Sequence, residues 1–149
     1  MKIFVDADAC PKAAKEILYR TSKRLNVELI LVANTYTRVP TSEFIQFVLV
    51  PNNPDEADDR IIDLMHSGDL VISSDIPLAD RVIKKGGVVL DPRGILLTAD
   101  NIGEKLTMRN FKEELRQTGI DTRGPNAYGA QEKQRFANQL DRYLTLLLK

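Results

Sequence analysis

The feature that most constrains the fold is an alternation, along residues 1–98, of short apolar runs with stretches of helical periodicity. The expected strands are residues 2–5, 27–33, 44–50, 69–74 and 88–90. Three of them are nearly continuous apolar runs, which is typical of strands buried on both faces. We therefore predict an α/β fold of three layers (α/β/α), with helices on both faces of a central, mainly parallel five-stranded sheet.

The helices are expected where apolar residues recur at three- and four-residue steps. Asn53 and Pro54 suit the cap and the first position of a helix that runs to about His66. After Thr98 the chain is again helical, with a break near Thr107. The apolar anchors expected in this part are Ile102, Leu106, Phe111 and Leu115. A final helix carries a longer apolar stripe of the kind that faces a core, made by Phe136, Leu140, Tyr143, Leu144 and Leu147.

Length, charge and cysteine content narrow the class of protein. The chain has 149 residues, and we expect residues 1–149 to form a single domain. Lys plus Arg and Asp plus Glu number 21 each, so the net charge of zero gives no general attraction to nucleic acid or to an anionic membrane. Cys10 is the only cysteine, which favours a cytoplasmic protein without disulfides. No stretch approaches the roughly 20 apolar residues of a membrane helix, so we expect no membrane partner.

Acidic residues follow the expected strands. Asp6 and Asp8 come after the first strand, Asp75 follows the fourth, and Asp80 lies five residues further on. Asp58 lies instead within a helix, on the side of its apolar residues. In an open α/β sheet, ligands bind in the crevice outside the carboxyl ends of the strands. We therefore expect these five acids to line one cleft.

Carboxylates that converge on one cleft repel one another, and divalent cations remove that penalty. Ligands that offer only oxygen suit Mg²⁺ or Mn²⁺. Two such ions about 3.5–4 Å apart can generate a hydroxide nucleophile and stabilise a leaving phosphate oxygen. The acids therefore point to metal-dependent phosphate chemistry.

Each acid also has a purely structural interpretation. Asp6 suits a turn, and Asp8 and Asp75 suit the cap of a following helix. Asp58 and Asp80 suit a solvated helix surface.

A polyanionic substrate needs a local basic surface, because the whole chain is neutral. The cations that we consider for it are Arg38, Arg81, Arg93, Arg109, Lys112 and Arg123. Arg93 and Arg123 are each followed by Gly, which permits close approach of the backbone. Tyr128 can stack on a base of a single strand. We expect Arg38, Arg93, Arg123 and Tyr128 to bind the substrate, and single-stranded RNA to be the partner.

Three segments together resemble a known family. They are V-D-A-D-A-C-P from Val5, G-D-L-V-I-S-S-D-I-P-L-A-D-R-V-I-K-K-G-G from Gly68, and R-G-P-N-A-Y from Arg123. The chain is similar, over essentially its whole length, to the YaiI/YqxD family of uncharacterised bacterial proteins. That family is in turn similar to PIN-like domains, which are metal-dependent nucleases with a parallel sheet and clustered acids.

The resemblance implies a PIN-like fold and a ribonuclease that uses Mg²⁺ or Mn²⁺. The positions that match the PIN-like pattern are Asp6, Asp58, Ser73, Asp75, Leu78, Ala79 and Asp80. This sequence departs from that pattern in three places. Asp8 is an additional acid, Asp58 stands where Glu is more usual, and the stretch from Arg123 to Tyr128 has no general counterpart.

Two other functions remain open from the sequence. The D-x-D of Asp6 and Asp8 is similar to that of phosphatases of the haloacid dehalogenase superfamily, but Cys10 stands where they have Thr or Val. In addition, the acidic pair of that superfamily follows a strand, whereas Asp69 precedes one. The second alternative is a protein that binds RNA or a nucleotide without cleaving it.

Overall fold

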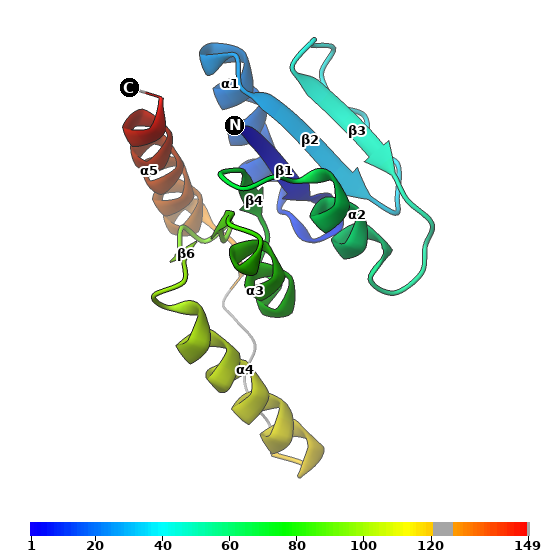
Figure 1. The fold of residues 1–149 in the computed structure, drawn as a ribbon, viewed down its shortest axis with the longest axis vertical. Coiled ribbons are helices and arrows are strands. Elements are labelled where there is room, and N and C mark those ends of the chain that lie inside the picture. The colour runs from blue at the N-terminus through cyan, green and yellow to red at the C-terminus, as the bar shows by residue number, and fades with distance from the viewer. Residues whose placement is uncertain (121–126, 149) are drawn as a thin grey trace.

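The computed structural model describes residues 1–120 and 127–148, and within them a single sheet has the strand order β3-β2-β1-β4-β5-β6 (Figure 1). The strands are β1 (Lys2–Asp6), β2 (Glu28–Ala33), β3 (Ile45–Leu49), β4 (Leu70–Ile72), β5 (Val88–Leu90) and β6 (Leu96–Leu97). The pairs from β3 to β5 are parallel, and β6 is antiparallel to β5. The predicted α/β class and mainly parallel sheet are confirmed.

The sheet has one strand more than predicted, because β6 returns along β5 after a tight turn. The turn places Gly94 at a φ of +92°, and the Gly94 N–H donates to the carbonyl of Asp91. A strand of two residues is too short to show any periodicity in a sequence.

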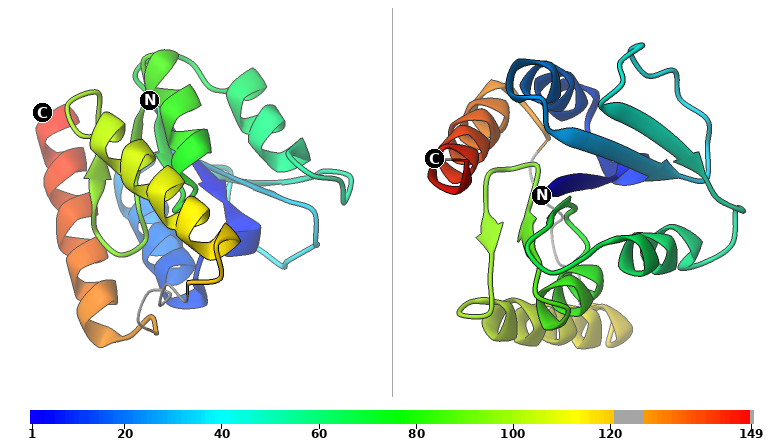
Figure 2. Two further views of the ribbon diagram at one scale, coloured as in Figure 1. Left: turned by 90° about the horizontal axis from the view of Figure 1, so that it is seen from below. Right: turned by 45° about the horizontal axis from the view of Figure 1, so that its top comes forward.

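Helices cover both faces of the sheet, as Figure 2 shows. One face carries α1 (Lys12–Leu25) and α5 (Ala130–Leu147), whereas the other carries α2 (Glu56–Leu64), α3 (Ile76–Lys84) and α4 (Ile102–Gln117). Side chains alternate along β1, so that Ile3 and Val5 pack with the first set of helices and Phe4 packs with the second. The predicted three layers are therefore confirmed.

Two helices differ from the sequence prediction. α2 begins at Glu56 rather than beside Asn53, and it is preceded by Asp55 in the left-handed region at a φ of +64°. α4 runs without a break through Thr107, whose hydroxyl donates to the carbonyl of Gly103 one turn earlier. Phe111 was expected to be an apolar anchor, but its side chain is 54% exposed.

Among the helices of the described residues, none is both long and apolar enough to pass through a bilayer.

A buried carboxylate fixes the amino ends of the two central strands. Asp69, just before β4, accepts hydrogen bonds from the backbone N–H groups of Lys2 (2.9 Å) and His66 (2.8 Å). The first bond ties the start of β1 to the start of β4. Since β1 and β4 are paired in parallel, their carboxyl ends must then also lie side by side.

We expect Asp69→Ala to lower the free energy of unfolding by about 1–3 kcal/mol, because two backbone N–H groups lose a buried charged acceptor. Urea denaturation measures the change. Asp63→Ala, which removes an exposed carboxylate from α2, is the control and should shift stability by less than about 0.5 kcal/mol. Equal stability of the two variants would contradict the anchoring role of Asp69.

Candidate functional site

Four of the five predicted acids line one cavity of about 430 Å³: Asp6, Asp8, Asp58 and Asp75. Asp6 closes β1, and Asp8 lies in the short 3-10 helix η1 (Ala7–Ala9). Asp75 follows β4, and Asp58 comes from the first turn of α2. Four different segments therefore bring carboxylates to the same hollow.

The cavity lies where the order of the strands reverses. From β1 the chain first builds one side of the sheet, β2 and β3, and then crosses to β4 on the other side. The loops that leave β1 and β4 consequently part from each other, and such a switch point opens a crevice at the carboxyl ends of the strands. Asp6 is the last residue of β1, where the first loop begins, and Asp75 lies in the loop after β4.

The buried hydroxyl of Ser73 links the two loops. It donates to Oδ2 of Asp6 and accepts from the backbone N–H of Asp75, both at 3.0 Å. The side chain of Ser73 is almost fully buried, so these bonds form away from water. One hydroxyl thus sets the position of Asp6 relative to the turn that carries Asp75.

Backbone donors hold two further carboxylates. Asp8 accepts from the backbone N–H of Asn34 at 2.7 Å, which joins η1 to the end of β2. Asp75 accepts from the N–H of Leu78 at 3.0 Å and therefore caps α3. The capping interpretation of Asp75 is confirmed, and the same side chain also lines the cavity. Asp8 does not cap α1. The cap position of that helix is Pro11, and no side chain forms a cap hydrogen bond there.

Electrostatic repulsion and burial act on these carboxylates together. Burial raises the pKa of Asp6, the hydrogen bond from Ser73 lowers it, and the charges of Asp75 and Asp8 raise it again. Burial raises the pKa of Asp58 to about 6, helped by the charges of Asp75, Asp6 and Asp55, while the Arg81 guanidinium lowers it. Asp58 is affected in this way although a negative charge is usually favourable in the first turn of a helix.

The donor set fits a hard divalent cation in its chemistry, because all of the side-chain ligands offer oxygen. The described residues contain no group of three or more His, Cys, Asp or Glu side chains placed to hold a metal ion among themselves. Mg²⁺ commonly binds through one or two carboxylates, keeps several water ligands and takes the rest from a substrate phosphate. Such a mode needs only a pair of the carboxylates that share the cavity.

Asp80 does not reach the cavity. It lies on α3, where its carboxylate pairs with Lys84 at 2.8 Å one turn away. Its spacing of five residues from Asp75 places it on a different side of the helix from the cap, because an α-helix turns once in 3.6 residues.

Arg93 and Tyr128, two of the predicted binding residues, share a neighbouring hollow of about 370 Å³. The Arg93 guanidinium lies over the Tyr128 ring, 5.9 Å from its centre, and Arg93 also pairs with Glu132 at 3.9 Å. Ala9 and Ser74 line the same hollow, so it adjoins the chain segments that carry Asp8 and Asp75. Arg38 lies exposed in the loop between β2 and β3 and lines neither hollow, and Arg123 lies outside the described residues.

Sequence reasoning missed polar residues that complete the cavity wall. Asn34 follows β2, and the turn before α2 contributes Asn52, Asn53 and Asp55. Asn34 follows a predicted strand, as Asp6 and Asp75 do, and that position was the available signal. Asp55 adopts a positive φ, which is uncommon for a residue other than Gly and tends to occur at functional sites.

Cys10 takes no part in this chemistry. Its side chain is buried in the core cluster that faces α1 and α5, and burial raises the pKa of its thiol to about 12. A thiol with that pKa stays protonated near neutral pH and is a poor nucleophile.

A parallel α/β sheet with an acidic cavity at its switch point defines the structural class of this protein. The chain belongs to the uncharacterised YaiI/YqxD family, because the model of that family, described as "Uncharacterized BCR, YaiI/YqxD family", matches residues 4–146. The predicted membership in this family is confirmed. The further likeness to PIN-like domains stays a prediction.

Curated relatives from several bacteria match the chain almost end to end. A UPF0178 protein of Shewanella sediminis is 55% identical over 145 residues, which cover 97% of either chain. A UPF0178 protein of Maridesulfovibrio salexigens is 54% identical over 97% of this chain and 96% of its own. A UPF0178 protein of Cupriavidus pinatubonensis is 54% identical with the same coverage. No solved structure matches the chain significantly.

Ser73→Ala tests the link between the two loops. We expect it to lower the free energy of unfolding by about 1–3 kcal/mol, because the N–H of Asp75 and the carboxylate of Asp6 lose a buried partner. The pKa of Asp6 should rise further, since the hydrogen bond from Ser73 holds it down. Chemical denaturation and a carbon-detected NMR titration measure these two quantities. Ser74→Ala, at the exposed neighbouring position, should change neither, and an unaltered Asp6 pKa in Ser73→Ala would refute the link.

Asp58→Asn tests whether the ionised carboxylate of Asp58 destabilises the folded state. The folded-state pKa of Asp58, about 6, exceeds its ordinary value of 3.8, so the folded state loses stability as the pH rises from about 4 to about 6. Above this range we expect Asp58→Asn to be more stable than the wild type by on the order of 1 kcal/mol, after a discount for the partial exposure of the side chain. The difference should vanish below about pH 4.

Thermal unfolding at several pH values measures this effect. Asp63→Asn, an exposed change of charge on the same helix, should show no such dependence on pH. An Asp58→Asn variant that is less stable than the wild type at high pH would show that the ionised Asp58 carboxylate does not destabilise the folded state.

Proposed function

We propose that the protein is a metal-dependent nuclease that hydrolyses phosphodiester bonds of single-stranded RNA at the acidic cavity. The observation that carries the proposal is the convergence of Asp6, Asp8, Asp58 and Asp75 on one hollow at the switch point of the sheet. A set of acids that repel one another and still share a cavity is costly for the folded state unless a cation joins them. The predicted likeness to PIN-like nucleases supports the same reaction class.

In this proposal a pair of the cavity carboxylates holds Mg²⁺ or Mn²⁺, with water and a substrate phosphate as the other ligands, and Ser73 keeps Asp6 aligned for that task. When bound, such an ion lowers the pKa of water and neutralises charge on a phosphate. The reaction forms a bond from a water oxygen to phosphorus and breaks the bond from phosphorus to the leaving ribose oxygen. The residues of the chain position the ion and the phosphate, while Arg93 and Tyr128 offer a cation and an aromatic ring to the substrate in the adjoining hollow.

The placement of Asp69 removes it from the acids available to the phosphatase alternative, while Asp58 and Asp75 lie beside the D-x-D. A phosphatase of the haloacid dehalogenase type needs further acids near its D-x-D, at the carboxyl end of the sheet. Asp69 lies at the opposite end of β4, and both of its oxygens accept backbone hydrogen bonds.

A binding protein without catalysis is the second candidate. It is favoured by the fact that the described residues form no ready-made group of three metal ligands. In this alternative the protein holds RNA and leaves it intact.

We expect the wild type to cleave a fluorescently labelled oligouridine strand when Mn²⁺ or Mg²⁺ is present and to lose this activity in EDTA. Asp6→Asn, Asp58→Asn and Asp75→Asn should each reduce the rate by about 100-fold or more, as the loss of a group that stabilises a charged transition state typically does. Asp63→Asn changes the same charge on an exposed part of α2 and should cleave like the wild type.

The results separate the two candidates. Cleavage that persists in all three cavity variants would show that the activity belongs to a contaminant or to another site. Binding of the strand without cleavage by any variant, with either ion, would favour the binding protein.

A further inference from the structure

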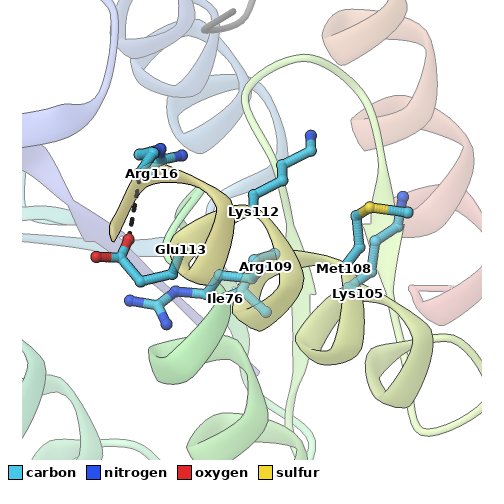
Figure 3. A pocket seen from close by; sticks show the side chains of 7 residues that line it. All are labelled: Ile76, Lys105, Met108, Arg109, Lys112, Glu113 and Arg116. Atoms are coloured by element: carbon cyan, nitrogen blue, oxygen red, sulfur yellow. Dashed lines mark hydrogen bonds and ion pairs between the residues drawn. The ribbon is translucent and has the colours of Figure 1, made fainter. Parts of the chain in front are cut away.

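A row of cations lies along one side of α4. Lys105, Arg109, Lys112 and Arg116 follow one another at steps of four, three and four residues, which place them on one helix face. Together with Ile76, Met108 and Glu113 they line a groove of about 350 Å³ between α3 and α4, shown in Figure 3. We call this surface the α4 groove. It concentrates positive charge on a chain whose net charge is zero.

The first three cations of the α4 groove are available to a ligand. Lys105, Arg109 and Lys112 form no ion pair with any residue of the ranges 1–120 and 127–148. Arg116 is different, because it pairs with Glu113 at 3.2 Å. Over the 11 residues from Lys105 to Arg116 the helix advances about 16 Å, so the row can contact several phosphates of an extended strand.

The α4 groove begins next to the acidic cavity. Ile76, which lines the groove, directly follows Asp75, which lines the cavity and caps α3. In Figure 3 the side chain of Arg109 passes close to Ile76, the residue that directly follows Asp75 in the chain. The start of α3 therefore lies between the groove and the carboxylates.

Exposed apolar side chains accompany the cations. α4 buries only Ile102 among its described residues, whereas Met108 and Phe111 are more than half exposed. Met108 lines the α4 groove and also a shallow apolar hollow that it shares with Phe111. Phe111 does not line the α4 groove, because its position in the helix turns it away from the row of cations, so Met108 is the apolar side chain that lies beside them.

We propose that the α4 groove binds the backbone of a single-stranded nucleic acid and delivers it to the acidic cavity. Lys105, Arg109 and Lys112 contact phosphates of the strand, and Met108 packs against it in the same groove. The inference rests on the proposed function for the identity of the reaction, but the binding that it assigns to α4 is measurable without any cleavage. It also gives the neutral chain the local basic surface that a polyanion requires.

The test measures binding of fluorescein-labelled oligouridine in EDTA by fluorescence anisotropy over a range of salt concentrations. We expect the triple variant Lys105→Gln/Arg109→Gln/Lys112→Gln to bind at least about ten-fold more weakly at low salt. Its salt dependence, the slope of log K against log salt, should fall by about 2, since each lost contact with a single strand removes about 0.7. The matched control is Lys12→Gln/Arg20→Gln/Lys23→Gln, which removes the same charges from α1 on the opposite face of the sheet.

Phe111→Ala is a second control on the same helix, because Phe111 lies outside the α4 groove. Because Phe111 is exposed, the substitution should leave stability unchanged, and we expect the affinity and the salt slope of the wild type. Cleavage of a uridylyl-uridine dinucleotide, which is too short to occupy the groove, should proceed equally in the wild type and in the α4 triple variant.

The outcomes distinguish this inference from the proposed function. If the α4 triple variant loses binding while no variant cleaves RNA, the groove is supported and the nuclease proposal fails. If cleavage depends on Asp6 and Asp75 but the α4 triple variant binds and cleaves oligouridine like the α1 control, the groove is refuted and the nuclease stands. A wild type that does not bind the strand at all also refutes the groove.

Discussion

The site depends on one buried hydroxyl, that of Ser73, which joins the ends of the two central strands. Parallel pairing of β1 with β4 brings these carboxyl ends together, and Asp69 links the amino ends of the same two strands. The carboxylates of Asp6 and Asp75 repel each other. The two hydrogen bonds of Ser73 hold the corresponding chain segments together against this repulsion. The rigid part of the fold therefore maintains an arrangement of charges that the charges themselves oppose.

The strands and their terminal acids could be predicted from the sequence, because buried parallel strands are continuous apolar runs and their ends are marked by polar residues. That logic placed Asp6, Asp8 and Asp75 near strand ends and Asp58 on the apolar side of its helix, and the structure brings these four side chains to one cavity. The same reasoning was wrong for Asp80, which pairs with Lys84 and does not line the cavity. Its distance from Asp75 along the sequence does not show which side of α3 it faces.

Other features depend on tertiary structure that local patterns do not encode. Phe111 fits an apolar stripe, yet of that stripe only Ile102 and Leu106 reach the core cluster, and the Phe111 ring remains exposed. The positive φ of Asp55 depends on how the loop after β3 must turn to start α2. The cations of α4 are one solvated face among several in the sequence, and only the position of Ile76 shows that this face borders the cavity.

The zero net charge of the chain conceals an asymmetry. Negative charge gathers in the cavity, and positive charge gathers along α4 at its border, so the two form a local electric dipole. A polyanion that approaches at low ionic strength experiences a torque from such a dipole before any contact forms, and it meets α4 first. The charge distribution can therefore orient an approaching polyanion, although the overall charge of the molecule is zero.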